Sequence, residues 1–316
     1  MRFDLLFTPE LRLTYAEKCR TLRRLIDADD PLLLPLIYDA VSAQMFERAG
    51  WPVMYLSGGF LSSAALGLAD VGLINQFETV TRARYVANAI NSPLVVDADS
   101  GYGNVLNSLR TAHDLFQAGA AAIQVEDQIL PKRSGTMGGK ELVSMQEASA
   151  KLAAICKLRD EIAPGAVVIA RCDAFNAPNG GIDELIRRCV AYREAGADVI
   201  FPEALRNEQD IARVLSEVGK PILYNMVAGN LIPIEQLKAL GVSIALHGEA
   251  LFCTMRALWD YAHALKKDPD GVEQSFREAG VGHPVGTIPA FLDFFQLQSI
   301  ARLNSSLQLH KFEEET

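Results

Sequence analysis

The chain has 316 residues, of which 30 are Lys or Arg and 39 are Asp or Glu, so its formal net charge is −9. A chain with this charge lacks the basic surface that nucleic acids and anionic membranes require, and neither is expected as a partner. Hydrophobic residues make up 49% and charged residues 22%, a composition that excludes a largely disordered chain. At this length either two ordinary domains or one α/β barrel is expected.

The five cysteines are scattered and form no C-x-x-C pair, which argues against a zinc ribbon and against a disulfide framework. The first 25 residues carry Asp4 and Glu10 and lack the apolar core of a signal peptide. No stretch approaches the roughly 18 uninterrupted apolar residues of a membrane span. A soluble, cytoplasmic protein is therefore expected.

One local pattern recurs along the chain: a helix end, a glycine, and a short apolar run that ends in a polar residue. Glycine directly after a helix suits the left-handed conformation that terminates it. An apolar run without alternation is typical of a parallel strand that is buried on both faces. The pattern occurs as ERAGWPVMYLS at 47–57, QAGAAAIQVED at 117–127, EAGADVIFPEA at 194–204 and LGVSIALH at 240–247.

Runs of this kind predict eight strands, with amphipathic helices between most of them. Strict strand–helix alternation repeated eight times indicates a (β/α)8 TIM barrel. A doubly wound open sheet is the alternative, but its Gly-rich nucleotide-binding motif after the first strand is missing. The predicted strands are Leu34–Tyr38, Val53–Ser57, Leu94–Asp97, Ala122–Glu126, Val167–Arg171, Val199–Pro202, Ile222–Asn225 and Ser243–His247, and the helices include Asn107–Ala118, Met145–Ile162, Ile182–Glu194 and Asn207–Val218.

Residues 1–316 are predicted to form a single barrel domain, with a helical extension at about 268–316. A helix over Ala250–Lys267 precedes this extension, and an apolar helix is expected within AFLDFFQLQSIARL at 290–303. An apolar helix added to a complete barrel has no obvious place in its core. It is expected to pack on another subunit, and packing back on its own barrel is the alternative.

Polar residues follow nearly every predicted strand, and in a barrel these positions meet at the carboxyl-terminal mouth. Asp39 and Asp173 could serve only as helix N-caps. Carboxylates gathered at low dielectric repel one another and therefore call for a cation. The residues at strand ends are Asp39, Ser57, Asp97, Asp99, Glu126, Asp127, Arg171, Asp173, Glu203, Asn225 and His247.

Asp97 and Asp99 leave the third strand, and Glu126 ends the fourth beside it. An all-oxygen carboxylate set suits Mg²⁺, with Mn²⁺ also possible, rather than zinc. Because Mg²⁺ keeps several waters, some of these acids are expected to act through bound water.

Three further segments fit a site for a small carboxylate. Ser57-Gly58-Gly59 follows the second strand, where backbone N–H groups can approach an anion or where the glycines simply form a tight turn. Arg171 can hold a carboxylate or enolate oxygen with a paired fork, or form a salt bridge to a nearby acid. The basic, Gly-rich residues 130–140 fit a mobile lid over the mouth, and an ordinary surface loop is the alternative.

Two other strand-end residues are given structural roles. Cys172 is adjacent to Arg171 and could act as an acid, but strand alternation points its side chain to the opposite side. His247 is expected to be a buried histidine hydrogen-bonded to the structure rather than a substrate contact.

Together these residues resemble the isocitrate lyase / phosphoenolpyruvate mutase superfamily, particularly its short methylisocitrate-lyase-like members. The resemblance extends from about Ile37 to Leu251. The motifs that carry it are YLSGG at 55–59, GLAD at 67–70, DADSGYGN at 97–104, QVEDQ at 124–128, PKRSG at 131–135, IARCDA at 169–174, FPEA at 201–204 and YNM at 224–226.

The resemblance implies a barrel whose last helix is swapped between the subunits of a homodimer, usually within a homotetramer. It implies Mg²⁺-binding acids, several of which act through water, and a substrate-carboxylate cradle. The metal-binding acids would be Asp70, Asp97, Asp99 and Glu126, and the substrate-carboxylate cradle would be Ser57, Gly58 and Gly59. The further substrate-binding positions would be Tyr55, Asp97, Arg171, Glu203 and Asn225. Lys132 would lie on the gating loop.

One position departs from the family pattern. The carbon–carbon lyases of this family carry a loop reading K-[KR]-C-G-H, whose Cys protonates the departing enolate, whereas residues 132–136 read Lys-Arg-Ser-Gly-Thr. A hydroxyl at Ser134 is a far weaker acid than a thiol, so proton delivery is expected to suffer. The phosphonate-cleaving branch usually carries a loop Asn, and none occurs between Asn107 and Asn176.

The function predicted is Mg²⁺-dependent cleavage of a C–C bond in a small 2-oxo or 2-hydroxy dicarboxylic acid through a metal-stabilised enolate. Arg171, Tyr55, Lys132 and Ser134 are the candidate catalytic residues. Decarboxylation of an oxaloacetate-like acid needs the missing Cys least, and a lyase acting on a methylisocitrate- or dimethylmalate-like acid is the close second. The alternatives are P–C bond chemistry on phosphonopyruvate and a non-catalytic metabolite-binding barrel.

Overall fold

The computed structural model describes residues 12–135, 137–226 and 232–306 of the chain. Residues 13–251 form one compact unit, and residues 252–306 belong to a second unit together with Arg12. No helix within the described ranges is long and apolar enough to cross a membrane. The barrel unit carries all of the predicted site residues.

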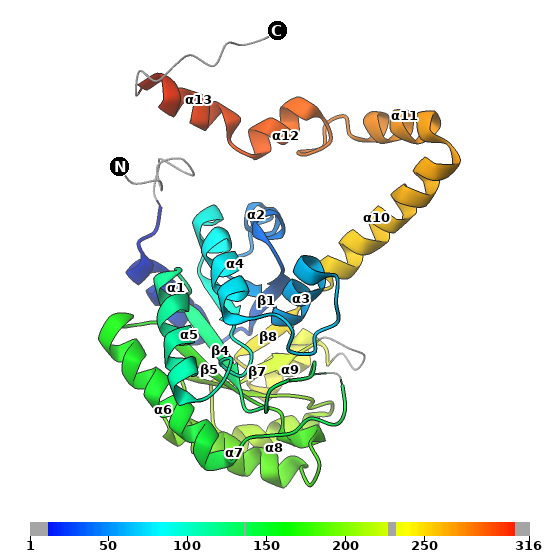
Figure 1. The fold of residues 1–316 in the computed structure, drawn as a ribbon. Coiled ribbons are helices and arrows are strands. Elements are labelled where there is room, and N and C mark those ends of the chain that lie inside the picture. Colours follow the sequence, from blue (N-terminus) through cyan, green and yellow to red (C-terminus); the bar gives the residue numbers. More distant parts are fainter. Residues whose placement is uncertain (1–11, 136, 227–231, 307–316) are drawn as a thin grey trace. The chain divides into compact units, whose positions relative to one another are not determined.

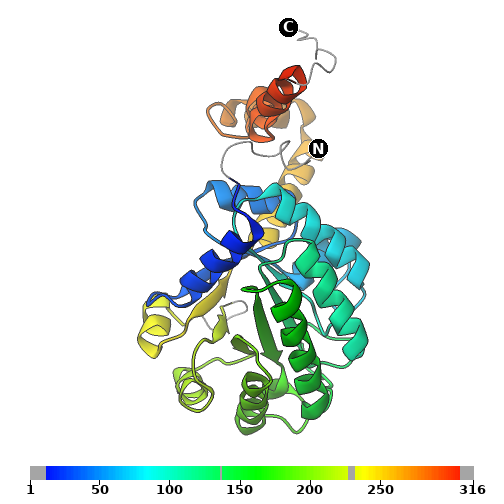
Figure 2. The ribbon, with the colours of Figure 1, turned by 90° about the vertical axis from the view of Figure 1, so that its left-hand side faces the viewer.

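The first unit is built on eight strands that pair in parallel in the order β6-β5-β4-β3-β2-β1-β8-β7 (Figures 1 and 2). An isolated parallel bridge between Ile200 and Ile222 links the two ends of this order, so the sheet is a nearly closed barrel rather than an open sheet. The strands are β1 Leu32–Ile37, β2 Met54–Leu56, β3 Leu94–Asp97, β4 Ala122–Glu126, β5 Val167–Cys172, β6 Val199–Pro202, β7 Leu223–Asn225 and β8 Ile244–His247.

Helices follow the strands around the barrel, which confirms the (β/α)8 prediction. Most begin at a side-chain cap; Asp39, for example, accepts a hydrogen bond from the Ser42 N–H at the start of α2 and is thus the N-cap considered from the sequence. The helices of this unit are α1 Tyr15–Ile26, α2 Ala40–Arg48, α3 Gly58–Leu66, α4 Gln76–Ala89, α5 Val105–Gln117, α6 Met145–Ile162, the 3-10 turn η2 Ala174–Asn176, α7 Ile182–Glu194, α8 Glu208–Val218 and α9 Ile234–Leu240.

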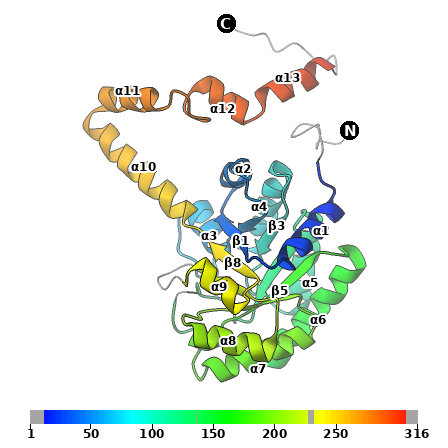
Figure 3. The same cartoon turned by 180° about the vertical axis from the view of Figure 1, so that it is seen from behind.

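The strand boundaries agree closely with the sequence prediction, and the largest difference lies at the first strand. The structure begins β1 two residues earlier than predicted, because Leu32 and Leu33 pair with Ile244 and Ala245 of β8. Figure 3 shows β1 and β8 from the other side of the barrel. A pairing partner more than 200 residues away leaves no mark on the local pattern.

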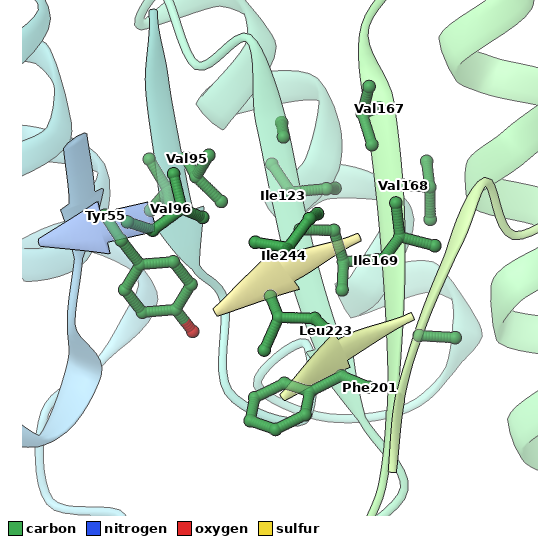
Figure 4. Close-up of a cluster of buried hydrophobic side chains, with 14 of the residues drawn as sticks. Tyr55, Val95, Val96, Ile123, Val167, Val168, Ile169, Phe201, Leu223 and Ile244 are labelled. Atoms are coloured by element: carbon green, nitrogen blue, oxygen red, sulfur yellow. The ribbon is translucent and has the colours of Figure 1, made fainter. Parts of the chain in front are cut away.

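Apolar side chains fill the barrel, as Figure 4 shows for a cluster drawn from β2 to β8. Tyr55, Phe201, Leu223 and Ile244 are each at most 2% exposed. Burial of this kind contributes on the order of 25 cal/mol per Å² of apolar surface. A rigid core of this size fixes the strand ends, and with them the polar residues of the mouth.

Strand register brings two pairs of polar residues at the mouth next to each other. Asp97 of β3 is aligned with Gln124 of β4, and Glu126 of β4 is aligned with Arg171 of β5. Parallel neighbouring strands lie about 4.8 Å apart, so these side chains start within reach of one another.

The second unit contains α11 Pro269–Ala279, α12 Ile288–Phe294 and α13 Leu297–Ser306, preceded by α10 Ala250–Lys267. The single apolar helix expected within residues 290–303 is wrong: it is divided into α12 and α13. Gln296 lies between them with φ +63°, in the left-handed region that a continuous helix does not contain.

Candidate active site

Four carboxylates and one lysine ammonium lie together at the carboxyl ends of β2 to β4. Lys132 Nζ is 2.5 Å from Asp70 Oδ1 and 2.7 Å from Asp99 Oδ1. A methyl group added to Gly58 would lie 2.9 Å from Asp99 Oδ1 and 3.0 Å from an Asp97 oxygen. One added to Gly59 would lie 3.2 Å from Asp70 Oδ2. The absence of a side chain at both glycines therefore lets the start of α3 approach the acids.

Local conformation places each acid of this cluster. Asp97 ends β3, and Asp99 follows in a turn with φ +46°, a conformation that Asp tolerates better than most residues. Asp70 comes after α3, which is terminated by Gly67 in the left-handed conformation. The end of α3 at Gly67 and the residues after it thus bring Asp70 to the same lysine as Asp99.

Asp97 is held by three donors, which fixes its orientation. Its Oδ1 accepts from the Asp99 N–H at 3.1 Å and from Gln124 Nε2 at 2.9 Å, and its Oδ2 accepts from the Gly58 N–H at 3.1 Å. The Gly58 amide, expected from the sequence to face a substrate carboxylate, therefore positions an acid of the cluster. Ser57 is the N-cap of α3, where its Oγ accepts from the Phe60 N–H at 3.3 Å.

Burial raises the pKa of three of the clustered acids. The pKa of Asp99 rises to about 6 through burial, with Lys132 opposing the rise. The pKa of Asp97 is raised in the same way, and that of Glu126 is raised well above its usual range by burial despite Arg171 and Lys132. Conversely, although burial lowers it, the surrounding acids raise the pKa of Lys132, so its charge is retained. The cluster therefore favours a positive group at its centre.

Tyr55 reaches the cluster indirectly. Its hydroxyl donates to Gln124 Oε1, and Gln124 in turn donates to Asp97. Burial, followed by the charge of Asp97, raises the pKa of Tyr55 well above its usual range. The geometry favours Tyr55 as a hydrogen-bonding residue over Tyr55 as a proton donor to an enolate. Gln124, a polar residue inside a buried strand, was not singled out from the sequence, although its position among apolar neighbours was the available signal.

Arg171 is held by Asp173 on one edge and covers an aromatic ring. Its Nε and Nη2 each donate to an Asp173 oxygen at 2.9 Å, and its guanidinium carbon is 5.3 Å from the centre of the Phe201 ring. Glu126 Oε2 lies 3.5 Å from Nε. Asp173 makes no side-chain cap to the following 3-10 turn, so its position at a strand end serves the arginine instead.

Residues 130–135 and 137–140, called the lid segment below, lie against the mouth. Lys132 and Lys140 are 3% and 1% exposed, so two of the basic groups predicted for a lid point inward. The Ser134 N–H donates to the Asp70 carbonyl at 3.1 Å. A methyl group at Gly135 would lie 2.7 Å from Glu203 Oε1 and 2.8 Å from Arg171 Nη2. The segment therefore contacts both the acid cluster and the arginine.

Glu203 and Asn225 lie together beside the lid segment. Asn225 Nδ2 is 3.3 Å from Glu203 Oε2 and 3.4 Å from its Oε1, and Glu203 is 4% exposed. The structure thus places every predicted site residue at the same end of the barrel, in two groups joined by Arg171 and Glu126.

The structure tests the structural roles that the sequence predicted for Cys172 and His247. Cys172 points away from the arginine, with its Sγ 3.5 Å from Asp127 Oδ2 and buried, as strand alternation predicts. His247 is exposed, so the expectation of a buried histidine is wrong. It is the last residue of the short strand β8, aligned with Pro35 of β1 but beyond the last residue of β8 that pairs with β7.

A (β/α)8 barrel with buried carboxylates, an arginine and an inward-facing lysine at its mouth has the architecture of a barrel enzyme, with its polar groups where the active sites of this fold lie. The family model of phosphoenolpyruvate phosphomutase matches residues 22–266. The chain belongs to this family, within the isocitrate lyase / phosphoenolpyruvate mutase superfamily.

The curated relatives include lyases. A 2,3-dimethylmalate lyase of Eubacterium barkeri is 35% identical over 88% of this chain and 94% of its own length. A 2-methylisocitrate lyase of Halalkalibacterium halodurans is 41% identical over 67% of this chain and 68% of its own length. These relatives support assigning the chain to the carbon–carbon lyases of the superfamily.

Solved structures agree over nearly the whole chain. Oxaloacetate acetylhydrolase in complex with the inhibitor 3,3-difluorooxalacetate has a TM-score of 0.83, is 28% identical, and covers 94% of this chain and 99% of its own. A phosphonopyruvate hydrolase in complex with oxalate and Mg²⁺ has a TM-score of 0.78, is 26% identical, and covers 91% of this chain and 98% of its own.

Proposed function

We propose that the chain is a Mg²⁺-dependent enzyme that cleaves a C–C bond of a small 2-oxo dicarboxylic acid, and that oxaloacetate-type decarboxylation is its reaction. The observation that carries the proposal is the acid cluster of the buried Asp97, Asp99 and Glu126 and the partly buried Asp70, gathered around one positive group beside Arg171. Such a cluster costs free energy unless a cation accompanies it.

The acids fit a hard divalent cation. Asp99 Oδ2 and Glu126 Oε1 are buried and make no hydrogen bond of good geometry to any described residue. Within the described parts of the chain, no three Asp, Glu, His or Cys side chains are close enough together to hold an ion by themselves. Mg²⁺ retains several waters, so Asp70, Asp97, Asp99 and Glu126 would hold it partly through water. Mn²⁺ has the same preference for oxygen ligands.

Bound there, the cation would supply Lewis-acid stabilisation of negative charge on substrate oxygens. Arg171 adds a second fixed positive charge, and its pairing with Asp173 leaves the N–H groups of Nη1 for a substrate carboxylate or enolate oxygen. The Gly59 N–H in the first turn of α3 has no partner inside the helix and, with the Ser57 hydroxyl, is suited to a carboxylate. Glu203 and Asn225 complete the wall on the Arg171 side.

Ser134 favours decarboxylation over the other reactions of this family. When CO2 leaves an oxaloacetate-like acid, the electron pair of the broken bond becomes the enolate of pyruvate, which water can protonate. No strong acid is needed on the lid segment, and a serine hydroxyl is not one. Lys132 lies among the acids, so its positive charge is available to balance the negative charge of the carboxylates and of the substrate during the reaction.

The test is turnover of oxaloacetate with Mg²⁺ present, compared with EDTA-treated enzyme and with the Arg171→Met variant. Pyruvate and CO2 should form at a rate that falls by at least about 100-fold in both comparisons, because each removes charge stabilisation of the enolate. Equal rates with and without the chelator would overturn the proposal.

A lyase acting on a substituted malate or citrate is the second candidate. The similarity to 2,3-dimethylmalate lyase over 88% of this chain favours it. Ser134, or a water held by it, would then protonate the departing enolate. Turnover of 2,3-dimethylmalate or methylisocitrate that is abolished by Ser134→Ala would establish this candidate and displace decarboxylation.

Phosphonopyruvate chemistry is the remaining enzymatic alternative. Its support is the likeness to phosphonopyruvate hydrolase and the family model, and the missing loop Asn opposes it. Phosphorus NMR with phosphonopyruvate distinguishes it, because cleavage of the P–C bond moves the phosphorus signal to that of phosphate or a phosphate ester.

We also propose that the C-terminal helices pack on a second copy of the chain, in a homodimer or homotetramer. Large apolar side chains of α10 to α12 are exposed in the single chain, among them Met255, Leu258, Trp259, Phe276 and Ile288. Large exposed apolar side chains in this number are typical of subunit contacts. Light scattering on the full chain and on a chain ending at Lys267 tests this, since the shorter chain should lose its oligomeric state.

A further inference from the structure

The ammonium group of Lys140, at the end of the lid segment, is buried against Asp173, the residue that also holds Arg171. The residue is 1% exposed, and the side chains of Lys140 and Asp173 are both fully inaccessible. Lys140 Nζ donates to Asp173 Oδ1 at 2.6 Å and to the Gly135 carbonyl at 2.8 Å. A charge buried so completely is costly unless such partners are present.

Asp173 connects this lysine to the arginine of the site. It accepts two hydrogen bonds from Arg171, and its own N–H donates to Asp127 Oδ1 at 2.9 Å. Although burial raises it, Arg171 and Lys140 together lower the pKa of Asp173 to about 2, so the carboxylate is ionised at neutral pH. Arg171, Asp173 and Lys140 therefore form a buried row of alternating charge.

Gly135 connects the same lysine to the lid segment. Its Cα lies so close to Glu203 and Arg171 that a methyl group there would lie within 3 Å of both. The backbone just before it is held by Gln128, whose side chain donates to the Arg133 carbonyl and accepts from the Arg133 N–H, each at 2.9 Å. The lid segment is thus held at two points, and Lys140 holds the point that contacts Arg171.

We propose that Lys140 is a positioning residue that couples the closed lid segment to the orientation of Arg171. When Gly135 leaves the mouth, Lys140 loses one of its two partners, and the Asp173 that holds Arg171 loses a fixed neighbour. When Gly135 returns, the same ammonium fixes both. The importance of Arg171 for the substrate rests on the function proposed above, whereas the coupling itself does not.

Lys140→Met tests the coupling, with Lys151→Met as the matched control. Lys151 is also buried, at 4% exposure, but lies on α6 and pairs with Glu147. Trypsin cleavage after Arg133 requires the lid segment to open, and cleavage after the exposed Lys157 reports opening of α6 instead. Lys140→Met should accelerate cleavage after Arg133 about tenfold relative to Lys157, and Lys151→Met should leave that ratio within about twofold. An unchanged ratio in Lys140→Met would overturn the proposal.

Ligand binding gives a readout that loss of stability alone would not produce. Calorimetry with Mg²⁺ alone and then with oxalate in the presence of Mg²⁺ separates the acid cluster from Arg171. Lys140→Met should weaken oxalate binding about tenfold and leave Mg²⁺ binding within about twofold. Equal weakening of both ligands would indicate a general structural role and contradict the proposal.

Asp173→Asn tests the route by which Lys140 acts, and on its own it should also accelerate cleavage after Arg133 if Lys140→Met folds poorly, because it removes the carboxylate that joins Lys140 to Arg171. Because Lys140 is proposed to act through Asp173, the double variant should be cleaved after Arg133 no faster than Asp173→Asn alone, a non-additive result. Additive effects would mean that Lys140 acts by another route. Neither measurement requires turnover, so either result stands even if the proposed reaction is wrong.

Discussion

Lys132 and Asp99 form a buried ion pair in which Nζ lies 2.7 Å from Oδ1, with the two side chains 3% and 2% exposed. The lysine comes from the lid segment and the aspartate from the turn after β3, so the pair joins a loop to the rigid end of the barrel. The ammonium occupies the centre of the acids proposed to hold the metal. Lysine and a divalent cation should therefore compete for the same carboxylates.

Lys132→Met is expected to destabilise the chain in EDTA and much less in Mg²⁺. Removing one partner of a buried ion pair costs about 3–5 kcal/mol because it leaves carboxylate charge uncompensated, whereas a bound cation compensates it again. Thermal unfolding in EDTA and in saturating Mg²⁺ measures the difference. Arg133→Met, which removes an exposed charge from the same segment, is the control and should shift neither midpoint appreciably. An equal loss of stability in both buffers would contradict the competition.

Binding of Mg²⁺ should weaken as the pH falls through about 6. Burial raises the pKa of Asp99 to about 6, and a protonated carboxyl group is a poor ligand for a hard cation. The affinity should therefore be highest above that pH and fall by up to about tenfold for each pH unit below it. Calorimetry between pH 8 and pH 5 measures this. Asp99→Asn should bind more weakly at pH 8 and lose most of the dependence near pH 6; an unchanged pH profile in that variant would assign the dependence to another acid.

Gly135→Ala should lower activity with little loss of stability. The new methyl group would displace Glu203 Oε1 and Arg171 Nη2, the ends of two side chains at the mouth rather than atoms of the core. A displacement of about 1 Å at a reacting centre can cost on the order of 100-fold in rate. Gly138→Ala is the control, because a methyl group there meets no described atom within 4 Å. Steady-state kinetics and thermal unfolding of both variants decide the matter, and equal activity in the two would refute the close packing of Gly135.

The barrel could be predicted because its signals are local. Gly50, Gly119, Gly196 and Gly241 all adopt positive φ after a helix, as the repeated pattern indicates, and an apolar run follows each. The division of residues 290–303 into two helices could not be predicted, because Gln296 in the left-handed region is not distinguished by composition from a residue inside a helix.

The residues of the site also separate into those that could be predicted from local signals and those that could not. Asp97, Asp99, Glu126 and Arg171 stand at strand ends, so the fold alone brings them together. Asp70 enters the cluster from a turn after α3, and only the family resemblance pointed to it. Lys140 was missed as an individual residue, because a lysine in a Gly-rich loop is usually exposed and nothing local indicates that Asp173 lies beneath it. Long-range ion pairs of this kind depend on the closed barrel and on the path of the loop.

Ser134→Cys should increase carbon–carbon lyase activity if the lid segment has retained the geometry of its relatives. A thiol has a pKa several units below that of a hydroxyl, so a cysteine between Arg133 and Gly135 could protonate an enolate near neutral pH, which a serine hydroxyl cannot do. General-acid catalysis contributes about 100-fold or more, so turnover of 2,3-dimethylmalate should rise by at least about tenfold. Oxaloacetate decarboxylation should change by less than about threefold in both Ser134→Cys and Ser134→Ala, because water protonates that enolate. Coupled assays of pyruvate release for both substrates measure these rates. A large loss of oxaloacetate turnover in Ser134→Ala would show instead that the serine itself delivers the proton.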